Sequence, residues 1–146
     1  MLERRRIEAE LVRALLPGLV DALGFERAHA VFASAIANEA ERQGRALRNE
    51  LPPGISGMAA LWERLRAGGA LEVTVQESTP RRLQLRVTRC RYAEMYRAMG
   101  LAELGAVLSC NRDASFCEGY DPGLKLTRTQ TLMDGATHCD FRYSRA

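Results

Sequence analysis

The C-terminal run Lys125-Leu-Thr-Arg-Thr-Gln-Thr-Leu-Met133, the turn Asp134-Gly135-Ala136 and the run Thr137-His-Cys-Asp-Phe-Arg-Tyr143 decide the fold of this chain. Two runs rich in β-branched and aromatic residues flank a glycine-containing turn, which predicts a β-hairpin with strands near 124–133 and 137–143. Because side chains alternate along a strand, His138, Asp140 and Arg142 should share one face, and Cys139, Phe141 and Tyr143 the other. One thiol therefore faces an apolar layer.

The sequence before this hairpin changes its hydrophobic period at Gly68-Gly69. Residues 3–23, 26–47 and 56–67 repeat apolar side chains at helical spacing, which predicts three amphipathic helices. Residues 71–77 and 83–89 alternate apolar and polar side chains around a turn, which predicts a second hairpin. We therefore expect an α+β fold in which N-terminal helices pack on one face of an antiparallel sheet of about four strands. The chain, residues 1–146, should form a single domain with a helical half, 1–69, and a sheet and site-bearing half, 70–146.

Composition narrows the classes of function. The net charge is +3 and the arginines are spread over every segment, so nucleic acid is not favoured as a partner. No apolar run approaches the roughly 18 residues that span a bilayer, so we expect a cytoplasmic protein without a membrane partner. The four cysteines contain no Cys-x-x-Cys pair. Free thiols are therefore expected, with no metal and no cofactor, and a homo-oligomer remains open.

Successive blocks of the second half carry a family resemblance. They are Cys90-Arg-Tyr-Ala-Glu-Met-Tyr96, Gly100-Leu-Ala-Glu-Leu-Gly105, Leu108-Ser-Cys-Asn-Arg-Asp113, Glu118-Gly-Tyr-Asp-Pro122, Leu126-Thr-Arg-Thr-Gln-Thr131 and His138-Cys-Asp-Phe-Arg142. In this order they resemble the L-2-amino-thiazoline-4-carboxylic acid hydrolase family. The helical half is similar to that family only in pattern.

The resemblance implies a small-molecule hydrolase that opens the cyclic amidine ring of a 2-aminothiazoline-4-carboxylate-like substrate, toward L-cysteine. This reaction needs a nucleophile at the amidine carbon, a proton donor for the departing ring atom and a cation for the substrate carboxylate. Cys139 is the candidate nucleophile if a neighbouring cation lowers its pKa, and Asp113 or Glu94 is the candidate base for direct attack by water. Arg128 or Arg142 is the candidate carboxylate clamp. Further candidates for contact with the substrate are Cys90, Tyr92 and His138.

The same residues can also have purely structural roles. A cysteine on an apolar strand face is often a small buried hydrophobe, and the two arginines can equally form surface ion pairs. His138 points to the strand face opposite Cys139, which favours a surface or orienting role. The whole domain can also bind a small ligand or sense it through a thiol without catalysing a reaction. In either case we expect a pocket between residues 90–113 and the C-terminal hairpin.

Overall fold

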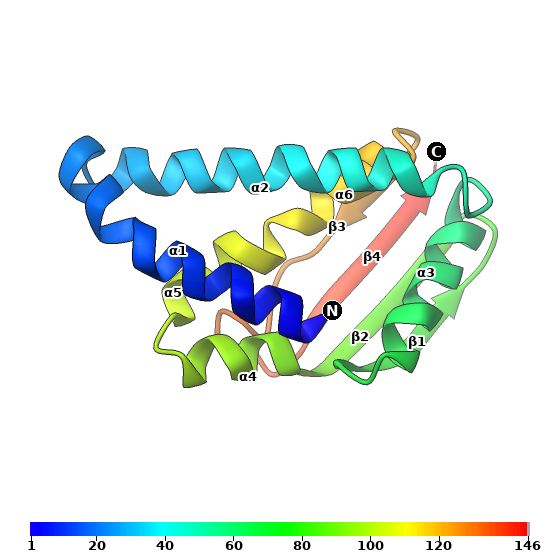
Figure 1. Ribbon diagram of the computed structural model, residues 1–146. Helices are drawn as coiled ribbons and strands as arrows, with labels where there is room; N and C mark the ends of the chain where they lie inside the picture. Colours follow the sequence, from blue (N-terminus) through cyan, green and yellow to red (C-terminus); the bar gives the residue numbers. More distant parts are fainter. Residues whose placement is uncertain (146) are drawn as a thin grey trace.

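The computed structural model describes residues 1–145 and begins with two long helices. Helix α1 (Leu2–Leu23) is followed at once by α2 (Phe25–Leu47), and the reversal of direction takes place at Gly24, whose φ is +82°. A positive φ is available to glycine at little steric cost, so the two helices can meet without a longer loop. In Figure 1, α2 runs past one end of the strands, and α1 lies beside the sheet near α4. Among the described residues, no helix combines the length and the apolar character that crossing a membrane requires.

The rest of the chain places helices between the strands. Its elements in chain order are α3 (Ile55–Ala67), β1 (Leu71–Ser78), β2 (Arg82–Cys90), α4 (Arg91–Ala98), α5 (Ala102–Gly105), the π-helical turn η1 (Ala106–Cys110), α6 (Arg112–Tyr120), β3 (Leu124–Thr127) and β4 (Cys139–Arg145). Helix α3 packs directly on the sheet, whereas α2 packs on α6, which in turn contacts β3. Helix α3 therefore covers one face of the sheet directly, whereas α2 is connected to it through α6.

The four strands form one antiparallel sheet in the order β1-β2-β4-β3. In the central pair, Val87 lies opposite Cys139, Leu85 opposite Phe141 and Leu83 opposite Tyr143. These side chains are buried on the face toward the helices, as the alternation in the sequence predicts. The predicted α+β class, with N-terminal helices on one face of a four-stranded antiparallel sheet, is confirmed.

The C-terminal hairpin is shorter than the sequence predicts, because residues 128–138 form no strand. The carboxylate of Asp140 accepts the backbone N–H groups of Thr129 and Gln130, at 2.8 and 3.0 Å, and the sulfur of Cys139 accepts that of Leu132 at 3.2 Å. These side-chain acceptors replace the partners that a strand ladder would supply. The prediction of strand over residues 128–133 and 137–138 is therefore wrong, and this segment is a loop folded against the start of β4.

Two apolar clusters stabilise the fold. The first lies between α3 and the sheet and includes Met58, Trp62, Leu85 and Phe141. The second joins the inner side of α1 to the segment from α4 to η1 and includes Ala9, Tyr96, Leu104 and Leu108. Removal of apolar surface from water is the main stabilising contribution of both clusters. The region between the two clusters holds the polar side chains described next.

Helices α2 and α6 cross at two glycines. A Cβ added to Gly44 would lie 2.7 Å from the backbone nitrogen of Tyr120, and a Cβ added to Gly119 would lie 2.8 Å from the carbonyl carbon of Glu41. Such distances are well inside van der Waals contact, so only glycine allows the two backbones to approach so closely. This crossing sets the position of α6, which carries Arg112 and Asp113 at its first turn.

Candidate functional site

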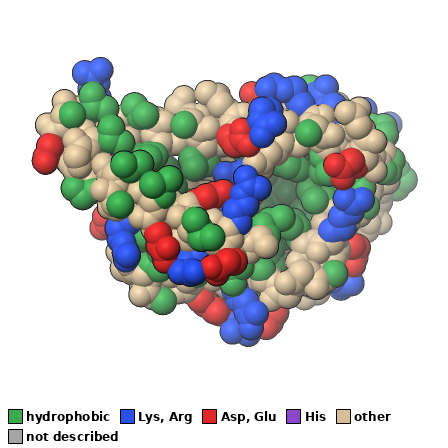
Figure 2. Space-filling model, in the orientation of Figure 1, with side chains coloured by type: hydrophobic (Ala, Val, Ile, Leu, Met, Phe, Trp, Pro, Cys, Tyr) green, Lys and Arg blue, Asp and Glu red, His purple; other side chains and the backbone are tan. Residues whose placement is uncertain are grey.

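A pocket of about 240 Å³ lies on the helical side of the sheet. Figure 2 shows it as a hollow with a hydrophobic floor and basic side chains on its rim. It borders α3, the segment from Cys90 to Asp113, and β4, and the start of α1 lies at its edge. Side chains on its wall include Met58, Leu61, Trp62, Leu65, Leu71, Val87, Cys90, Tyr92, Ser109, Cys110, Arg112, Asp113, Phe116, Arg128, Cys139, Phe141 and Tyr143.

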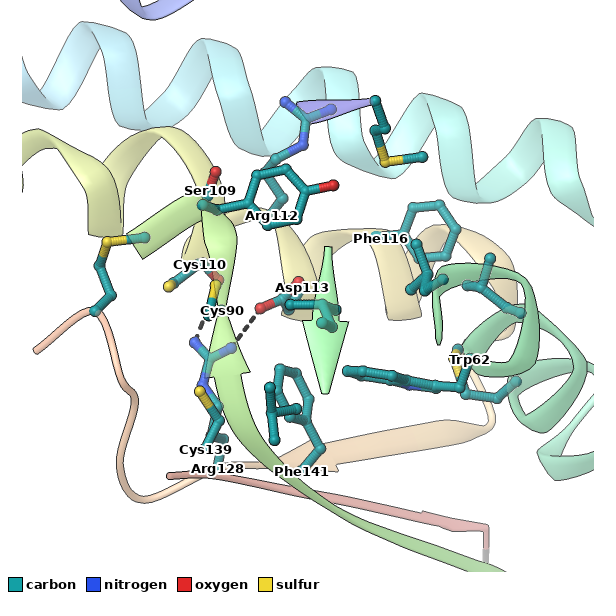
Figure 3. Close-up of a pocket in the computed structure, with 18 of the residues that line it drawn as sticks. Trp62, Cys90, Ser109, Cys110, Arg112, Asp113, Phe116, Arg128, Cys139 and Phe141 are labelled. Carbon is teal, nitrogen blue, oxygen red and sulfur yellow. Dashed lines mark hydrogen bonds and ion pairs between the residues drawn. The ribbon is translucent and has the colours of Figure 1, made fainter. Parts of the chain in front are cut away.

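An ion pair between Asp113 and Arg128 lies at the polar end of the pocket, as Figure 3 shows. Arg128 also donates a hydrogen bond to the carbonyl of Cys110, at 3.2 Å, and its guanidinium lies over the ring of Phe141, 5.1 Å from the centroid. The side chain of Asp113 is 34% exposed to solvent, and it lines the pocket. Burial raises the pKa of Asp113 above its ordinary value, and the paired Arg128 offsets only part of this effect. A carboxylate with a raised pKa and access to the pocket is suited to taking up and returning a proton.

The loop that carries Arg128 is held by Asp140. Besides the two backbone N–H groups, the Asp140 carboxylate accepts the hydroxyl of Thr129 at 2.6 Å. Burial acts to raise the pKa of Asp140, but these hydrogen bonds outweigh burial and hold the pKa below its ordinary value. Asp140 therefore stays ionised near neutral pH and fixes the backbone next to Arg128. Asp140 itself does not line the pocket and lies on the face of β4 opposite Cys139.

Arg112 brings a second guanidinium to the polar end of the pocket. It donates a hydrogen bond to the amide oxygen of Gln43 on α2, at 2.8 Å. Across residues 1–145, no carboxylate oxygen lies within 4.0 Å of its nitrogens. Burial lowers the pKa of Arg112 and the nearby Arg5 lowers it further, while Glu8 and Glu39 act in the opposite direction. Arg112 therefore adds a half-buried positive charge to the pocket wall, which makes it a candidate group for binding an anion.

Three thiols gather around Arg128 in Figure 3, those of Cys90, Cys110 and Cys139. Burial raises the pKa of Cys110 to about 12 and also raises the pKa of Cys90 and of Cys139. The N–H of Leu132 and the charge of Arg128 lower the pKa of Cys139, but burial has the larger effect. Cys139 can act as a nucleophile only if a neighbouring cation lowers the pKa of its thiol. Such a cation is present, and it does not overcome the burial of the thiol.

The other residues singled out in the sequence lie in different places. Tyr92 is half-buried on α4 and lines the pocket. Glu94, also on α4, is exposed, forms an ion pair with Arg89 at 2.7 Å and does not line the pocket. Arg142 is exposed on the face of β4 opposite Cys139 and pairs with Asp140 at 3.3 Å. His138 precedes β4, where its backbone carbonyl accepts the Gln130 amide at 3.0 Å, and it too lies outside the pocket wall.

Arg112 and Trp62 line the pocket but are not among the site residues that the sequence predicts. Arg112 stands beside Asp113 in a family-like block, so its position was a usable signal, but its partner Gln43 lies far away in sequence. Trp62 is both a buried core residue and part of the pocket wall. The one turn of π-helix at η1 ends at Cys110, and such turns are frequent at functional sites. In residues 1–145, no group of three or more His, Cys, Asp or Glu side chains is arranged to hold a metal ion.

Comparisons with known proteins agree with this fold. The crystal structure of the phenol-responsive sensory domain of the transcription activator PoxR with phenol is similar at a TM-score of 0.55 and 16% identity, over 90% of this chain and 71% of that chain. This likeness concerns the fold. A comparison with curated protein sequences finds no match. The family model described as L-2-amino-thiazoline-4-carboxylic acid hydrolase matches residues 4–143, which is nearly the whole chain. This protein therefore belongs to the L-2-amino-thiazoline-4-carboxylic acid hydrolase family.

Proposed function

We propose that this protein is a hydrolase acting on a carbon–nitrogen bond of a cyclic amidine that carries a carboxylate, with 2-aminothiazoline-4-carboxylate as the reference substrate and a product on the way to L-cysteine. The observation that supports this most is the half-buried ion pair of Asp113 and Arg128, which lines the pocket together with Arg112. An acid–base group and a second guanidinium on the wall of one pocket meet two needs of the reaction.

In the proposed reaction, Asp113 takes a proton from water as the water oxygen bonds to the amidine carbon. Asp113 then gives this proton to the ring nitrogen. The hydroxyl proton of the resulting tetrahedral adduct follows the same route as the carbon–nitrogen bond opens, so that a carbonyl and an amine are formed. Arg128 keeps Asp113 oriented, and Arg112 holds the substrate carboxylate. Cys90, Cys139 and Tyr92 form the wall around the ring.

The direct test is turnover of 2-aminothiazoline-4-carboxylate by the purified protein, followed by mass spectrometry of the ring-opened product. Product formation above the rate without protein is expected. A second candidate function is a small-ligand sensory domain without catalysis, which the likeness to the phenol-responsive domain favours. Calorimetric binding of the thiazoline carboxylate without any product would support that second function and contradict the first.

Replacing Arg112 with Gln should raise KM for an anionic substrate by about 10- to 150-fold, because a hydrogen bond to a charged group contributes about 1.5–3 kcal/mol. The change in kcat should be smaller, since Arg112 does not contact the amidine carbon in the proposed reaction. Arg112→Lys keeps the charge but not the planar fork, so an intermediate KM is expected. Steady-state kinetics measure both constants.

Arg86→Gln is the matched control for this experiment. Arg86 is an exposed arginine on β2, on the sheet face away from the pocket, so its replacement should leave KM unchanged. An unchanged KM in Arg112→Gln would remove Arg112 from the carboxylate site and assign that role to Arg128, which also lines the pocket.

Replacing Cys139 with Ala should leave turnover within about tenfold of the parent and lower stability by about 1 kcal/mol, which is typical of a modest packing change. The reason is that burial raises the pKa of Cys139, so the thiol is protonated near neutral pH and is a weak nucleophile. Kinetics and thermal unfolding of Cys139→Ala and Cys139→Ser measure the two effects. Loss of several orders of magnitude in both folded variants, with substrate protection of the parent against alkylation, would instead assign covalent attack to Cys139.

A further inference from the structure

The two ends of the pocket differ in chemistry. One end holds the charged side chains Asp113, Arg128 and Arg112. The other end is formed by apolar side chains from two helices and one strand: Met58, Leu61, Trp62, Leu65, Leu71 and Phe116. Most of the residues at this apolar end, including Trp62 in Figure 3, belong to α3, which packs directly on the sheet. A ligand that fills the pocket therefore contacts both kinds of surface.

Phe141 connects the two ends. Its ring makes an edge contact with Trp62, with the ring centroids 4.7 Å apart at 67°, and it also lies under the guanidinium of Arg128 at 5.1 Å. The Phe141 ring thus separates Arg128 from Trp62, and a ligand beside Arg128 needs about the length of one aromatic ring to reach Trp62. The indole N–H of Trp62 already donates a hydrogen bond to the hydroxyl of Tyr143, at 3.1 Å. What Trp62 offers to a ligand is thus apolar surface.

A single five-membered ring that carries an amino group and a carboxylate uses only the polar end. It leaves the apolar walls of α3 facing space in which water finds no hydrogen-bond partners. An apolar substituent on the ring would fill that space instead. Each methylene that such a substituent buries raises affinity by about fourfold.

We propose that the natural substrate of this pocket carries a bulky apolar or aromatic substituent in addition to its carboxylate, and that Leu61, Trp62 and Phe141 select it. This inference rests on the proposed function of the polar end. The substrate class is a cyclic amidine carboxylate that is substituted on the ring carbon next to the one bearing the carboxylate. The unsubstituted thiazoline carboxylate is then a poor substrate that binds through one end only.

The test compares 2-aminothiazoline-4-carboxylate with its 5-phenyl derivative in the parent protein. The value of kcat/KM for the phenyl derivative is expected to be about 100-fold higher, because several apolar carbons become buried. Leu61→Trp should fill the apolar end and remove this preference, so that the two rings have similar kcat/KM values in the variant. Equal kcat/KM values for the two rings in the parent would overturn the inference.

Leu47→Trp is the matched control. Leu47 and Leu61 are both half-buried leucines packed against the same apolar cluster, but Leu47 lies on α2 and does not line the pocket. The preference for the phenyl derivative should survive in Leu47→Trp. Its loss in both variants would mean that the substitution acts through the core and not through the pocket, which contradicts the assignment of Leu61.

Calorimetry separates a failure of this inference from a failure of the proposed reaction. If neither ring is turned over but the phenyl derivative binds about 100-fold more tightly than the unsubstituted ring, the hydrolase function fails and the two-ended pocket stands. If both rings are turned over with equal kcat/KM and bind equally, the reaction stands and the apolar selection fails. Leu61→Trp should abolish only the difference in affinity.

Discussion

Asp113→Asn is expected to reduce kcat by about 100- to 10,000-fold, the range that a positioned general acid or base contributes. The amide keeps nearly the same volume and can still accept a hydrogen bond from Arg128, so the variant should fold. It cannot take a proton from water, however, which is the step that the proposed reaction assigns to Asp113. Rapid-quench or steady-state turnover of the thiazoline carboxylate measures the loss, and circular dichroism checks the fold.

The same carboxyl group predicts the pH dependence of the parent. Asp113 acts as a base only when it is deprotonated, so kcat/KM should fall as the pH falls through its pKa. Because burial raises that pKa, the midpoint of this acid limb should lie above 3.8, the ordinary value for Asp. The residual activity of Asp113→Asn should lack this limb.

Two other carboxylates serve as comparisons for Asp113→Asn. Asp21→Asn alters an exposed position of α1 away from the pocket and should retain parental kinetics. Glu94→Gln tests Glu94, the second candidate for the general base. Full turnover in a folded Asp113→Asn variant, together with a large loss in Glu94→Gln, would transfer the base function to Glu94 and refute the proposed site.

Gly44→Ala and Gly119→Ala should each destabilise the protein by about 3 kcal/mol, at the upper end of the range for overpacked cores. In each case the added methyl group meets backbone atoms of the facing helix, which cannot move aside as the end of a flexible side chain can. For a chain of this size the expected fall in Tm is about 6–12 °C. Thermal unfolding monitored at a helical wavelength measures it.

Gly18→Ala provides a control with the opposite sign. Gly18 lies inside α1 and has no heavy atom within 4 Å of the position that a Cβ would occupy. Alanine loses less conformational freedom than glycine in a helix, so this change should stabilise the protein by about 0.5–1 kcal/mol. A parental Tm in Gly44→Ala and Gly119→Ala would show that α2 and α6 separate easily, contrary to the close crossing described above.

The crossing of α2 and α6 also matters for the site. Helix α6 carries Arg112 and Asp113, and α2 supplies Gln43, which binds Arg112. A displacement of α6 would move both charged groups relative to Arg128, which lies on the loop before β4. The two glycine variants should therefore bind the carboxylate substrate more weakly even below their Tm, and calorimetry at low temperature measures this loss.

The three N-terminal helices, the hairpin of β1 and β2 and the faces of the strands followed from the sequence by itself. Apolar side chains at helical spacing and strict alternation along 71–77 and 83–89 report which side of each element meets the core, because burial of one face is what stabilises it. The same alternation along a strand places Cys139 and Arg142 on opposite faces of the sheet. Since the pocket is on the Cys139 side, strand parity already implied that these two side chains do not line one cavity.

Only the tertiary structure decided where the C-terminal hairpin opens and which cation faces the pocket. The ladder ends at Thr127 because the side chains of Asp140 and Cys139 take the backbone N–H groups of residues 129, 130 and 132, a competition that hydrophobic period does not reveal. Arg112 becomes a candidate anion site because its neighbours Gln43 and Arg5 come from helices far away in sequence. Whether a charge is balanced and how deeply a thiol is buried depend on the three-dimensional surroundings of each group, which local sequence does not contain.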